Sequence, residues 1–183
     1  MNGLHLTTTR LELVAGTIAL AKAEIDDLPA LARMLNVPLP AHWPPPLNDE
    51  QSQKYFLNAL LNAAPDHAGW QLWYCVLREP RVLLGSAGFK GIPAEGLVEV
   101  GYSMLEEHQR NGYCTEAVRA LIGWAFQHPD VNLVIAHTLP DLLPSIRVME
   151  KCGLVFAGNG PLEDGVQTVR YELTRERFQQ SRR

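Results

Sequence analysis

The feature that most constrains the fold is a junction at residues 109–117, Gln-Arg-Asn-Gly-Tyr-Cys-Thr-Glu-Ala, between an expected strand and an expected helix. The preceding residues 97–104 contain β-branched and aromatic residues typical of a strand. Apolar residues then recur at helical spacing: Val118, Leu121, Ile122, Ala125 and Phe126. The small residues Gly112 and Cys114 leave the first helical turn open, and its N–H groups lie at the positive end of the helix dipole. The junction therefore predicts either an anion-binding turn or an ordinary helix start.

Two common phosphate-binding loops are excluded by the residues of this junction. A nucleoside triphosphate loop ends in Gly-Lys-Ser or Gly-Lys-Thr, and a dinucleotide loop needs three spaced glycines. The junction has neither pattern, since Gly112 is its one glycine. Hydride transfer and phosphoryl transfer are therefore disfavoured.

Outside the junction, hydrophobic patterns predict further strands and helices. We expect strands at residues 10–14, 70–78, 82–89, 132–137 and 166–173. We expect helices at residues 25–35, from a cap at Asn48 to near Pro65, and after Pro144. The core-facing residues expected in the first two of these helices are Leu28, Leu31, Ala32, Leu35, Phe56, Leu57, Leu60 and Leu61.

The order of these elements, βααβββαβαββ, indicates an α/β chain with a mixed sheet. The Glu79-Pro80 turn predicts an antiparallel hairpin of its two flanking strands. The apolar run at residues 132–137 is typical of a buried parallel strand. The Trp43-Pro44-Pro45-Pro46 segment excludes regular structure between the first two helices.

Length, composition and charge fit one soluble domain spanning residues 1–183. Hydrophobic residues make up 46% of the chain, enough for a sizeable core. The net charge is −4 and no basic run exceeds Arg182-Arg183, which disfavours nucleic acid and anionic membranes as partners. The three cysteines lack metal-ligand spacing, so neither a disulfide framework nor a metal site is expected. No signal-peptide pattern and no apolar run of about 18 residues is found, so we expect a cytoplasmic protein.

Several short motifs are shared with one enzyme superfamily. Residues 8–13 are Thr-Thr-Arg-Leu-Glu-Leu, residues 112–118 are Gly-Tyr-Cys-Thr-Glu-Ala-Val, and residues 145–156 begin Ser-Ile-Arg-Val-Met-Glu-Lys. Gln109, Gly112 and Cys114 match a Q/R-x-x-G-x-G/A loop, with Cys in place of the last Gly or Ala. Together these segments resemble the GNAT superfamily of N-acetyltransferases, and in particular its RimJ/RimL-like branch. The resemblance covers nearly the whole chain and implies a central mixed sheet with splayed strands, flanked by helices.

The resemblance implies that acetyl-CoA is the co-substrate and that its pyrophosphate lies over the N–H groups of residues 110–115. The residues implied to bind it are Met104, Leu105, Gln109, Arg110, Asn111, Gly112, Tyr113, Cys114 and Thr115. We expect the pantetheine arm to enter beside the strand that ends at Met104, where parted strands leave backbone groups unpaired. The chain departs from the branch at Leu142, where an Asn is common three residues before the Ser, and this departure bears on cofactor affinity.

Acetyl transfer from a thioester to an amine needs a group that accepts the amine's proton and a group that protonates the leaving thiolate. Glu99 is the first candidate base, because strand alternation sets it opposite Val98 and Val100 and because it matches a carboxylate of the branch. The alternative is a solvent-facing strand residue. Ser145 is the candidate acid by resemblance, since residues 140–152 contain no tyrosine. Its alternative is an N-cap for the helix that follows Pro144.

Five other residues are weaker candidates for the chemistry. Glu116 is already explained by the helix dipole, and His108 and His137 are more often structural at such positions. Cys114 and Cys152 have no base partner in the sequence and are expected as small core residues. We therefore favour direct transfer within a ternary complex over a covalent enzyme intermediate.

The acceptor is the least constrained part of the function. Residues 43–46, Trp70 and Trp73 either line an apolar acceptor pocket or pack in the core. The family acetylates both protein N-termini and small-molecule amines, and the fold does not choose between them. The alternative to an N-acetyltransferase is a non-catalytic module that binds acyl-CoA or a partner protein. Homodimer formation is left open.

Overall fold

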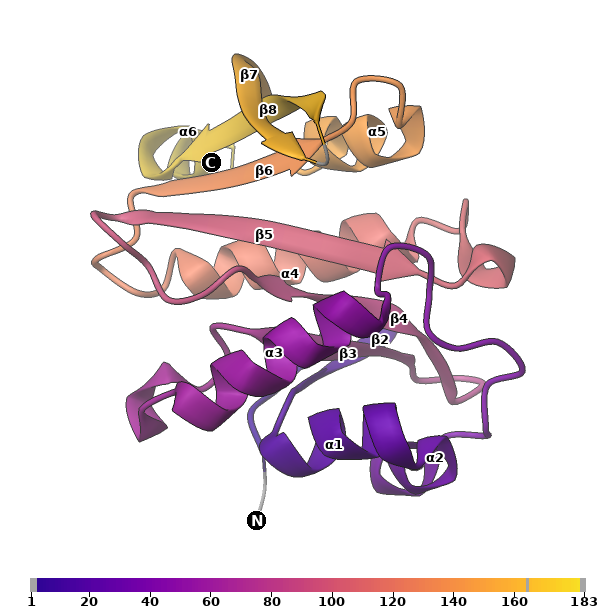
Figure 1. Cartoon of the computed structure of the whole chain (residues 1–183). Helices are drawn as coiled ribbons and strands as arrows, with labels where there is room; N and C mark the ends of the chain where they lie inside the picture. Colours follow the sequence, from indigo (N-terminus) through magenta and orange to yellow (C-terminus); the bar gives the residue numbers. More distant parts are fainter. Residues whose placement is uncertain (1–2, 164, 182–183) are drawn as a thin grey trace.

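The computed structural model describes residues 3–163 and 165–181 (Figure 1). Its elements are β1 (His5–Thr7), β2 (Leu11–Ala15), α1 (Ile18–Asp26), α2 (Leu28–Leu35), α3 (Glu50–Asn62), β3 (Leu72–Leu77), β4 (Val82–Phe89), β5 (Leu97–Met104), α4 (Tyr113–Ala125), β6 (Leu133–Thr138), α5 (Leu143–Lys151), β7 (Val155–Glu163), β8 (Val166–Thr174) and α6 (Arg175–Gln180). Short 3₁₀ helices occur at Pro65–His67 and Glu106–His108. Within the described ranges, no helix has the length and apolar character needed to cross a membrane.

The strands form one mixed sheet in the order β1-β2-β3-β4-β5-β6-β8-β7. Neighbouring strands are antiparallel except β5 and β6, which are parallel. The hairpin predicted at the Glu79-Pro80 turn is confirmed, because β3 and β4 pair antiparallel on either side of it. The expected α/β mixed-sheet class is therefore confirmed.

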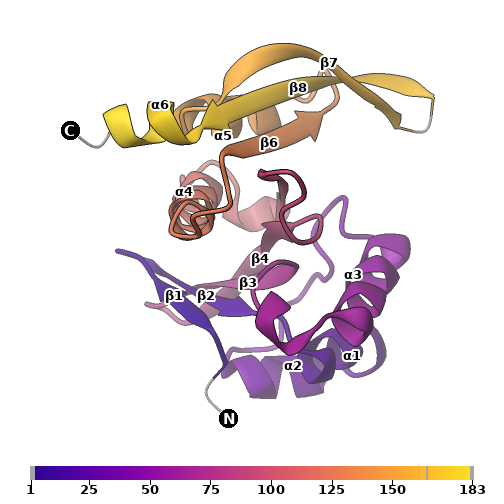
Figure 2. The same cartoon turned by 90° about the vertical axis from the view of Figure 1, so that its left-hand side faces the viewer.

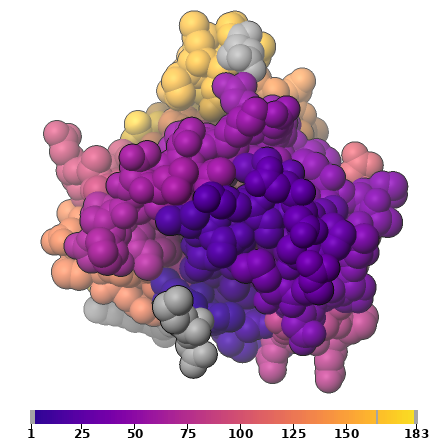
Figure 3. All heavy atoms as spheres, turned by 60° about the horizontal axis from the view of Figure 1, so that its bottom comes forward, coloured from indigo at the N-terminus to yellow at the C-terminus, as the bar shows by residue number. Residues whose placement is uncertain are grey.

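Helices cover both faces of the sheet and create two cores. On one face, α4 buries Val118, Leu121 and Ile122 against β5 and its neighbours. On the other face, α1 and α2 pack on β3 around Leu31 and Tyr74. Figure 2 shows α4 and the group α1–α3 on opposite sides of β2–β4. In the space-filling view of Figure 3, the indigo to purple atoms of the N-terminal segments cover one face of the molecule.

The predicted helix at residues 25–35 is wrong in extent, because two helices occupy this region. Thr17 caps α1 by accepting a hydrogen bond from the Leu20 amide at 3.2 Å. Asp27 ends α1 and caps α2, accepting from the Ala30 amide at 3.0 Å. The buried face of α1 consists of Leu20, two alanines and Glu24, so it lacks the wide apolar stripe that reveals a helix. The predicted burial in α2 holds, since Leu31, Ala32 and Leu35 are buried.

The cap and the inner face of α3 also need correction. Asp49 is the N-cap and accepts from the Ser52 amide at 2.8 Å, whereas Asn48 is buried and bonds elsewhere. Leu61 is 50% exposed, so its predicted burial is wrong, and the buried residue of this helix is Gln53. A polar residue faces inward here because it meets a buried carboxylate of α1.

Candidate active site

The first turn of α4 presents amide groups that the protein itself does not use. Gly112 is the N-cap, in a left-handed conformation with φ of 79°, and no side chain caps the helix. Within the described residues, the N–H groups of residues 110–115 donate no hydrogen bond. A Cβ added at Gly112 would meet the Arg10 guanidinium at 3.5 Å and would also strain the backbone. The turn thus fits an anion, because it is open, uncapped and positive.

Side chains of the same segment shape the loop before α4. The Gln109 side chain donates to the carbonyl of Met104 at 3.1 Å, and the Asn111 side chain donates to the carbonyl of Gln109 at 2.9 Å. Met104 and Leu105 are buried, and the Leu105 amide donates to the carbonyl of Leu84 at 2.8 Å. Among the residues implied to bind the cofactor, Gln109 and Asn111 therefore hold the loop in shape, and Leu105 offers least to a ligand.

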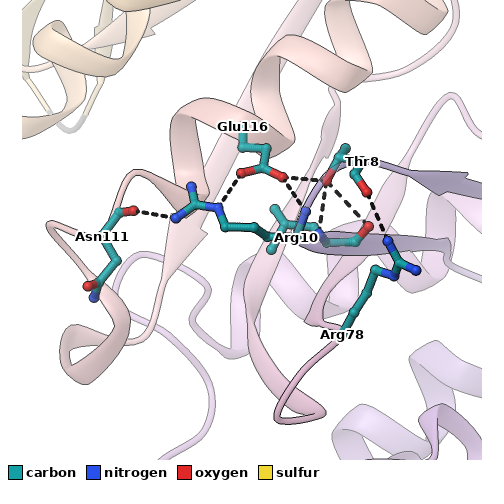
Figure 4. Close-up of polar contacts among 6 residues, drawn as sticks. Thr8, Arg10, Arg78, Asn111 and Glu116 are labelled. Atoms are coloured by element: carbon teal, nitrogen blue, oxygen red, sulfur yellow. Dashed lines mark hydrogen bonds and ion pairs between the residues drawn. The ribbon is translucent and has the colours of Figure 1, made fainter.

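Glu116 is held by the segment that precedes β2 (Figure 4). Its carboxylate accepts from the Arg10 Nε at 2.7 Å, the Arg10 amide at 2.8 Å and the Thr8 hydroxyl at 2.6 Å. Burial alone would raise the pKa of Glu116, but these donors and the Arg10 charge lower it. Arg10 also donates to the carbonyl of Asn111 at 3.0 Å and lies over the Tyr113 ring at 4.6 Å. Glu116 is thus a structural anchor between β2 and the α4 turn.

A depression of about 570 Å³ lies beside this turn. It is lined by Thr8, Thr9, Arg10, Gly112, Thr115, Glu116, Arg119, Ala120 and Lys151. Three cationic side chains face one carboxylate here, and that carboxylate is already paired with Arg10. The surroundings of the open amides are therefore positively charged, which suits a phosphate-bearing ligand.

The sheet parts at β5, as the sequence predicts. β5 and β6 pair over three residues each, from Leu97 with Leu133 to Glu99 with Ile135. Beyond this point β5 continues to Met104 and β6 to Thr138 without pairing to each other. The fork leaves backbone groups that the amides of an extended ligand can satisfy.

Glu99, the last residue of β5 that pairs with β6, lies at the fork inside a charged cluster. The alternation predicted for β5 is confirmed, because Val98 and Val100 are buried in the α4 core while Glu99 is partly exposed. Its carboxylate lies 2.6 Å from the Lys90 Nζ and 3.2 Å from the His137 Nδ1. That His137 nitrogen is buried and forms no hydrogen bond within the described residues.

Lys90 bridges Glu99 to the edge of the sheet. Its ammonium lies 3.6 Å from the Glu163 carboxylate on β7. Burial alone would lower the pKa of Lys90, but the Glu99 and Glu163 carboxylates outweigh it and raise the pKa. We call Lys90, Glu99, His137 and Glu163 the fork cluster.

A second polar pair lies farther along β5. The Tyr102 hydroxyl is 3.1 Å from the Ser145 Oγ and donates to the Ser145 carbonyl at 3.0 Å. Burial raises the pKa of Tyr102, so this phenol is in its protonated form at neutral pH. The predicted alternative of Ser145 as an N-cap is wrong, because Leu142 is the N-cap of α5 and Ser145 is its third residue. The cap carries no side-chain bond; instead the amide of Ser145 donates to the Leu142 carbonyl at 3.0 Å.

Comparison with known proteins identifies the family of this chain. The sequence model described as "Acetyltransferase (GNAT) domain" matches residues 17–155. The chain belongs to the GNAT acetyltransferase family. In Bacillus subtilis, the protein named uncharacterized N-acetyltransferase YjdG is 35% identical to this GNAT chain over 89 residues, which are 48% of the chain and 53% of the relative. The chain thus covers about half the length of the curated relatives that it matches.

Solved structures share the GNAT fold over most of their length. A ribosomal-protein-S5-alanine acetyltransferase from Vibrio fischeri aligns with a TM-score of 0.67 at 17% identity, over 94% of this chain and 97% of that one. The aminoglycoside acetyltransferase AAC(6')-Ib, solved with coenzyme A and kanamycin, aligns with a TM-score of 0.64 at 23% identity, over 94% and 99%. At these identities the likeness shows the fold alone. It confirms the expected GNAT architecture.

The GNAT chain gathers some of the predicted residues and separates others. Ser145 meets Tyr102, and Glu99 meets His137, but no contact joins Glu99 to Ser145. Sequence reasoning missed Tyr102 because it sought a tyrosine in the helix, whereas the phenol comes from β5. It also missed Lys90, although this residue directly follows β4. Strand alternation could have placed Tyr102 on the same face as Val100.

Trp70, Trp73 and Cys152 of the GNAT chain lie in the core, and Cys114 packs against it. Trp70 and Trp73 are 5% and 0% exposed, on the α4 face, so of their two alternatives core packing is confirmed and a place in the lining of an acceptor pocket is not. Burial raises the pKa of Cys114 well above its ordinary value and that of Cys152 to about 12, so both stay thiols. His108 ends a 3₁₀ turn before the loop. Among residues 3–163 and 165–181, no three His, Cys, Asp or Glu side chains are grouped to hold a metal ion.

Proposed function

We propose that this GNAT chain transfers the acetyl group of acetyl-CoA to a primary amine, by direct attack within a ternary complex. The observation that carries the proposal is the position of Glu99, where β5 and β6 part, on the strand that leads to the open amides before α4. One continuous path therefore leads from an anion-binding turn, along unpaired backbone, to a carboxylate.

The cofactor side of the proposal rests on the loop and first turn of α4. The N–H groups of residues 110–115 would hold the pyrophosphate, with Arg10, Arg119 and Lys151 supplying positive charge nearby. The bound thioester supplies an activated acetyl group with a thiolate as leaving group. Gly112 is required because a side chain there would be strained in the left-handed region.

The acceptor side of the proposal rests on the fork cluster. An amine that arrives protonated must lose a proton before its nitrogen can attack the thioester carbon. Glu99 accepts that proton, directly or through a water molecule, while Lys90 holds its carboxylate at 2.6 Å. When the C–S bond breaks, the nitrogen keeps the acetyl group and the thiolate needs a proton. The Tyr102 and Ser145 hydroxyls, 3.1 Å apart, form the pair that we assign to this proton.

The acceptor class follows from the chemistry of the site and the neighbours. One structure of this fold is named for an alanine of a ribosomal protein and another for an aminoglycoside, and both proteins and aminoglycosides present primary amines. We therefore propose a primary amine of a protein N-terminus or of a small molecule as the acceptor.

A thiol-release assay tests the proposed function. The protein is incubated with acetyl-CoA and a panel of amines that includes peptides with a free N-terminus and an aminoglycoside, and free CoA is measured. We expect CoA release that depends on both substrates, together with acetylated amine in equal amount by mass spectrometry. Calorimetric binding of CoA without turnover on any amine would instead indicate the non-catalytic binding module.

A further inference from the structure

Glu24 of α1 is a buried carboxylate that the proposed reaction does not use. It is 6% exposed and four side chains donate hydrogen bonds to it. Its Oε1 accepts from the Trp43 Nε1 at 3.2 Å, the Asn48 Nδ2 at 2.9 Å and the Gln53 Nε2 at 3.3 Å. Its Oε2 accepts from the Tyr74 hydroxyl at 2.7 Å.

The two oxygens of Glu24 bind different parts of the molecule. Oε2 faces β3, through Tyr74. Oε1 faces the connection from α2 to α3, where Trp43 and Asn48 bracket three consecutive prolines. Prolines have no N–H to donate, so this segment cannot be held by a backbone ladder. We call residues 43–48 the proline loop, and Glu24 provides its buried anchor.

The proline loop reaches β5 beyond the fork. The Ser103 hydroxyl donates to the Pro46 carbonyl. Ser103 lies an even number of residues from Glu99 on the same strand, so both side chains are on the same face of β5. Figure 1 shows the connection between α2 and α3 crossing the C-terminal end of β5.

Burying a carboxylate has an unfavourable desolvation free energy, which a loop that only filled space would not require. Burial raises the pKa of Glu24 despite its four donors, so the charged form is disfavoured there. Removing a donor that belongs to the loop frees that point of the loop from the carboxylate, so the position of the loop depends on the donors that it supplies itself, Trp43 and Asn48.

We propose that Glu24 is a positioning residue that fixes the proline loop against β5 as one wall of the acceptor site, an inference that rests on the proposed function. The wall stands on the Glu99 face of β5, away from the open amides before α4. Loosening it changes how the amine binds and leaves the binding of acetyl-CoA unchanged.

The test compares donors on the two sides of the same carboxylate. Trp43→Phe and Asn48→Ala remove donors from the proline loop, while Tyr74→Phe removes the donor from β3 and is the matched control. For an amine found in the panel, we expect the two loop variants to raise the KM for the amine about tenfold, as loss of one bond to a carboxylate implies. The KM for acetyl-CoA stays within about twofold, and Tyr74→Phe leaves both KM values within about twofold.

A conservative variant separates positioning from general stability. Glu24→Gln keeps one oxygen for the three Oε1 donors, and its amide group can donate to the Tyr74 oxygen. We expect it to keep the wild-type KM for the amine, whereas Glu24→Ala raises it. If Glu24→Ala does not fold, the two loop variants still decide the question.

Each outcome has a distinct meaning. Loop variants that leave the amine KM unchanged, or that raise both KM values together, overturn the positioning role while the proposed function stands. An equal rise with Tyr74→Phe also overturns it, since that variant removes only the β3 donor and keeps the ring that lies 6.5 Å from the Trp43 ring. Wild-type protein that acetylates no amine overturns the proposed function, and the proposed role of the proline loop as a wall of the acceptor site is then overturned as well.

Discussion

The proposed cofactor and acceptor sides of β5 differ in the groups that they offer to a ligand, which are backbone amides on one side and side chains on the other. The proposed cofactor side is one continuous stretch, residues 110–115, and it offers backbone N–H groups. The proposed acceptor side is a set of side chains from distant segments: Glu99 on β5, His137 on β6, Lys90 after β4, Glu163 on β7 and the proline loop anchored at Glu24. A backbone site tolerates changes of side chain, whereas a side-chain site can be retuned one residue at a time. The fold can thus keep one co-substrate while its acceptor changes.

The largest expected effect is on the acceptor side, at Glu99. Glu99→Gln should lower kcat/KM for the amine at least about 100-fold at neutral pH, because the amine loses its proton acceptor. The loss should shrink at high pH, where more of the amine is already neutral. Glu163→Gln is the matched control, since it removes the other carboxylate that contacts Lys90, at 3.6 Å. Equal losses in both variants, or a loss that does not vary with pH, would remove Glu99 as the base.

A smaller effect is expected at the hydroxyl pair. Tyr102→Phe and Ser145→Ala should each lower kcat about 10- to 100-fold and leave the Kd for CoA nearly unchanged, as for an interaction made mainly in the transition state. The double variant should lose little more than either single one, because the two hydroxyls are 3.1 Å apart and act together. Steady-state kinetics and calorimetry measure both quantities. Additive losses would show that the two hydroxyls act separately.

On the cofactor side, Arg10 should matter for binding alone. Arg10→Ala leaves Glu116 without its cationic partner beside the open amides, so the Kd for CoA should rise about three- to tenfold, and more so at low salt. kcat should not change. Arg78→Ala is the control, because Arg78 donates to the Thr8 carbonyl at 3.3 Å without a contact to Glu116. If both variants weaken CoA binding equally, the charge at Arg10 has no special role.

The smallest effects concern the stability of the fold. Its dependence on pH should have opposite signs at Glu116, on the cofactor side, and at Glu24, on the acceptor side. The pKa of Glu116 is lowered from 4.5, so its contribution is present above that pH and is lost as pH falls through the lowered value. The pKa of Glu24 is raised from 4.5, so its contribution is present below that pH and is lost as pH rises through the raised value. Relative to wild type, Glu116→Gln should therefore lose melting temperature at neutral pH and little in acid. The melting temperature of Glu24→Gln, relative to wild type, should be higher at neutral pH than in acid. Thermal melts of both variants across pH would contradict this if the two differences ran in the same direction.

The sequence predicted the strand and the helix start on either side of residues 105–112 better than the cluster around Glu99, for a physical reason. The turn before α4 depends on neighbouring residues, Gly112 above all, and the strand before it alternates regularly, so both are encoded locally. Lys90 and His137 meet Glu99 only because β4 and β6 flank β5 in the folded sheet. The buried position of Glu24 was not predicted, because a charged residue in an alanine-rich segment gives no apolar periodicity. The contact of Tyr102 was not predicted, because its partner, Ser145, is 43 residues away in the sequence.

A crystal structure of the protein with CoA is the most direct test of the proposed division of β5 into a cofactor side and an acceptor side. The account predicts that the amides of residues 110–115 donate hydrogen bonds to the pyrophosphate and that the pantetheine arm lies in the fork, with β5 and β6 still parting after Glu99. The thiol should then lie on the stretch of β5 between Glu99 and Met104. A pyrophosphate bound away from residues 110–115, or β5 and β6 paired along their full lengths, would contradict it.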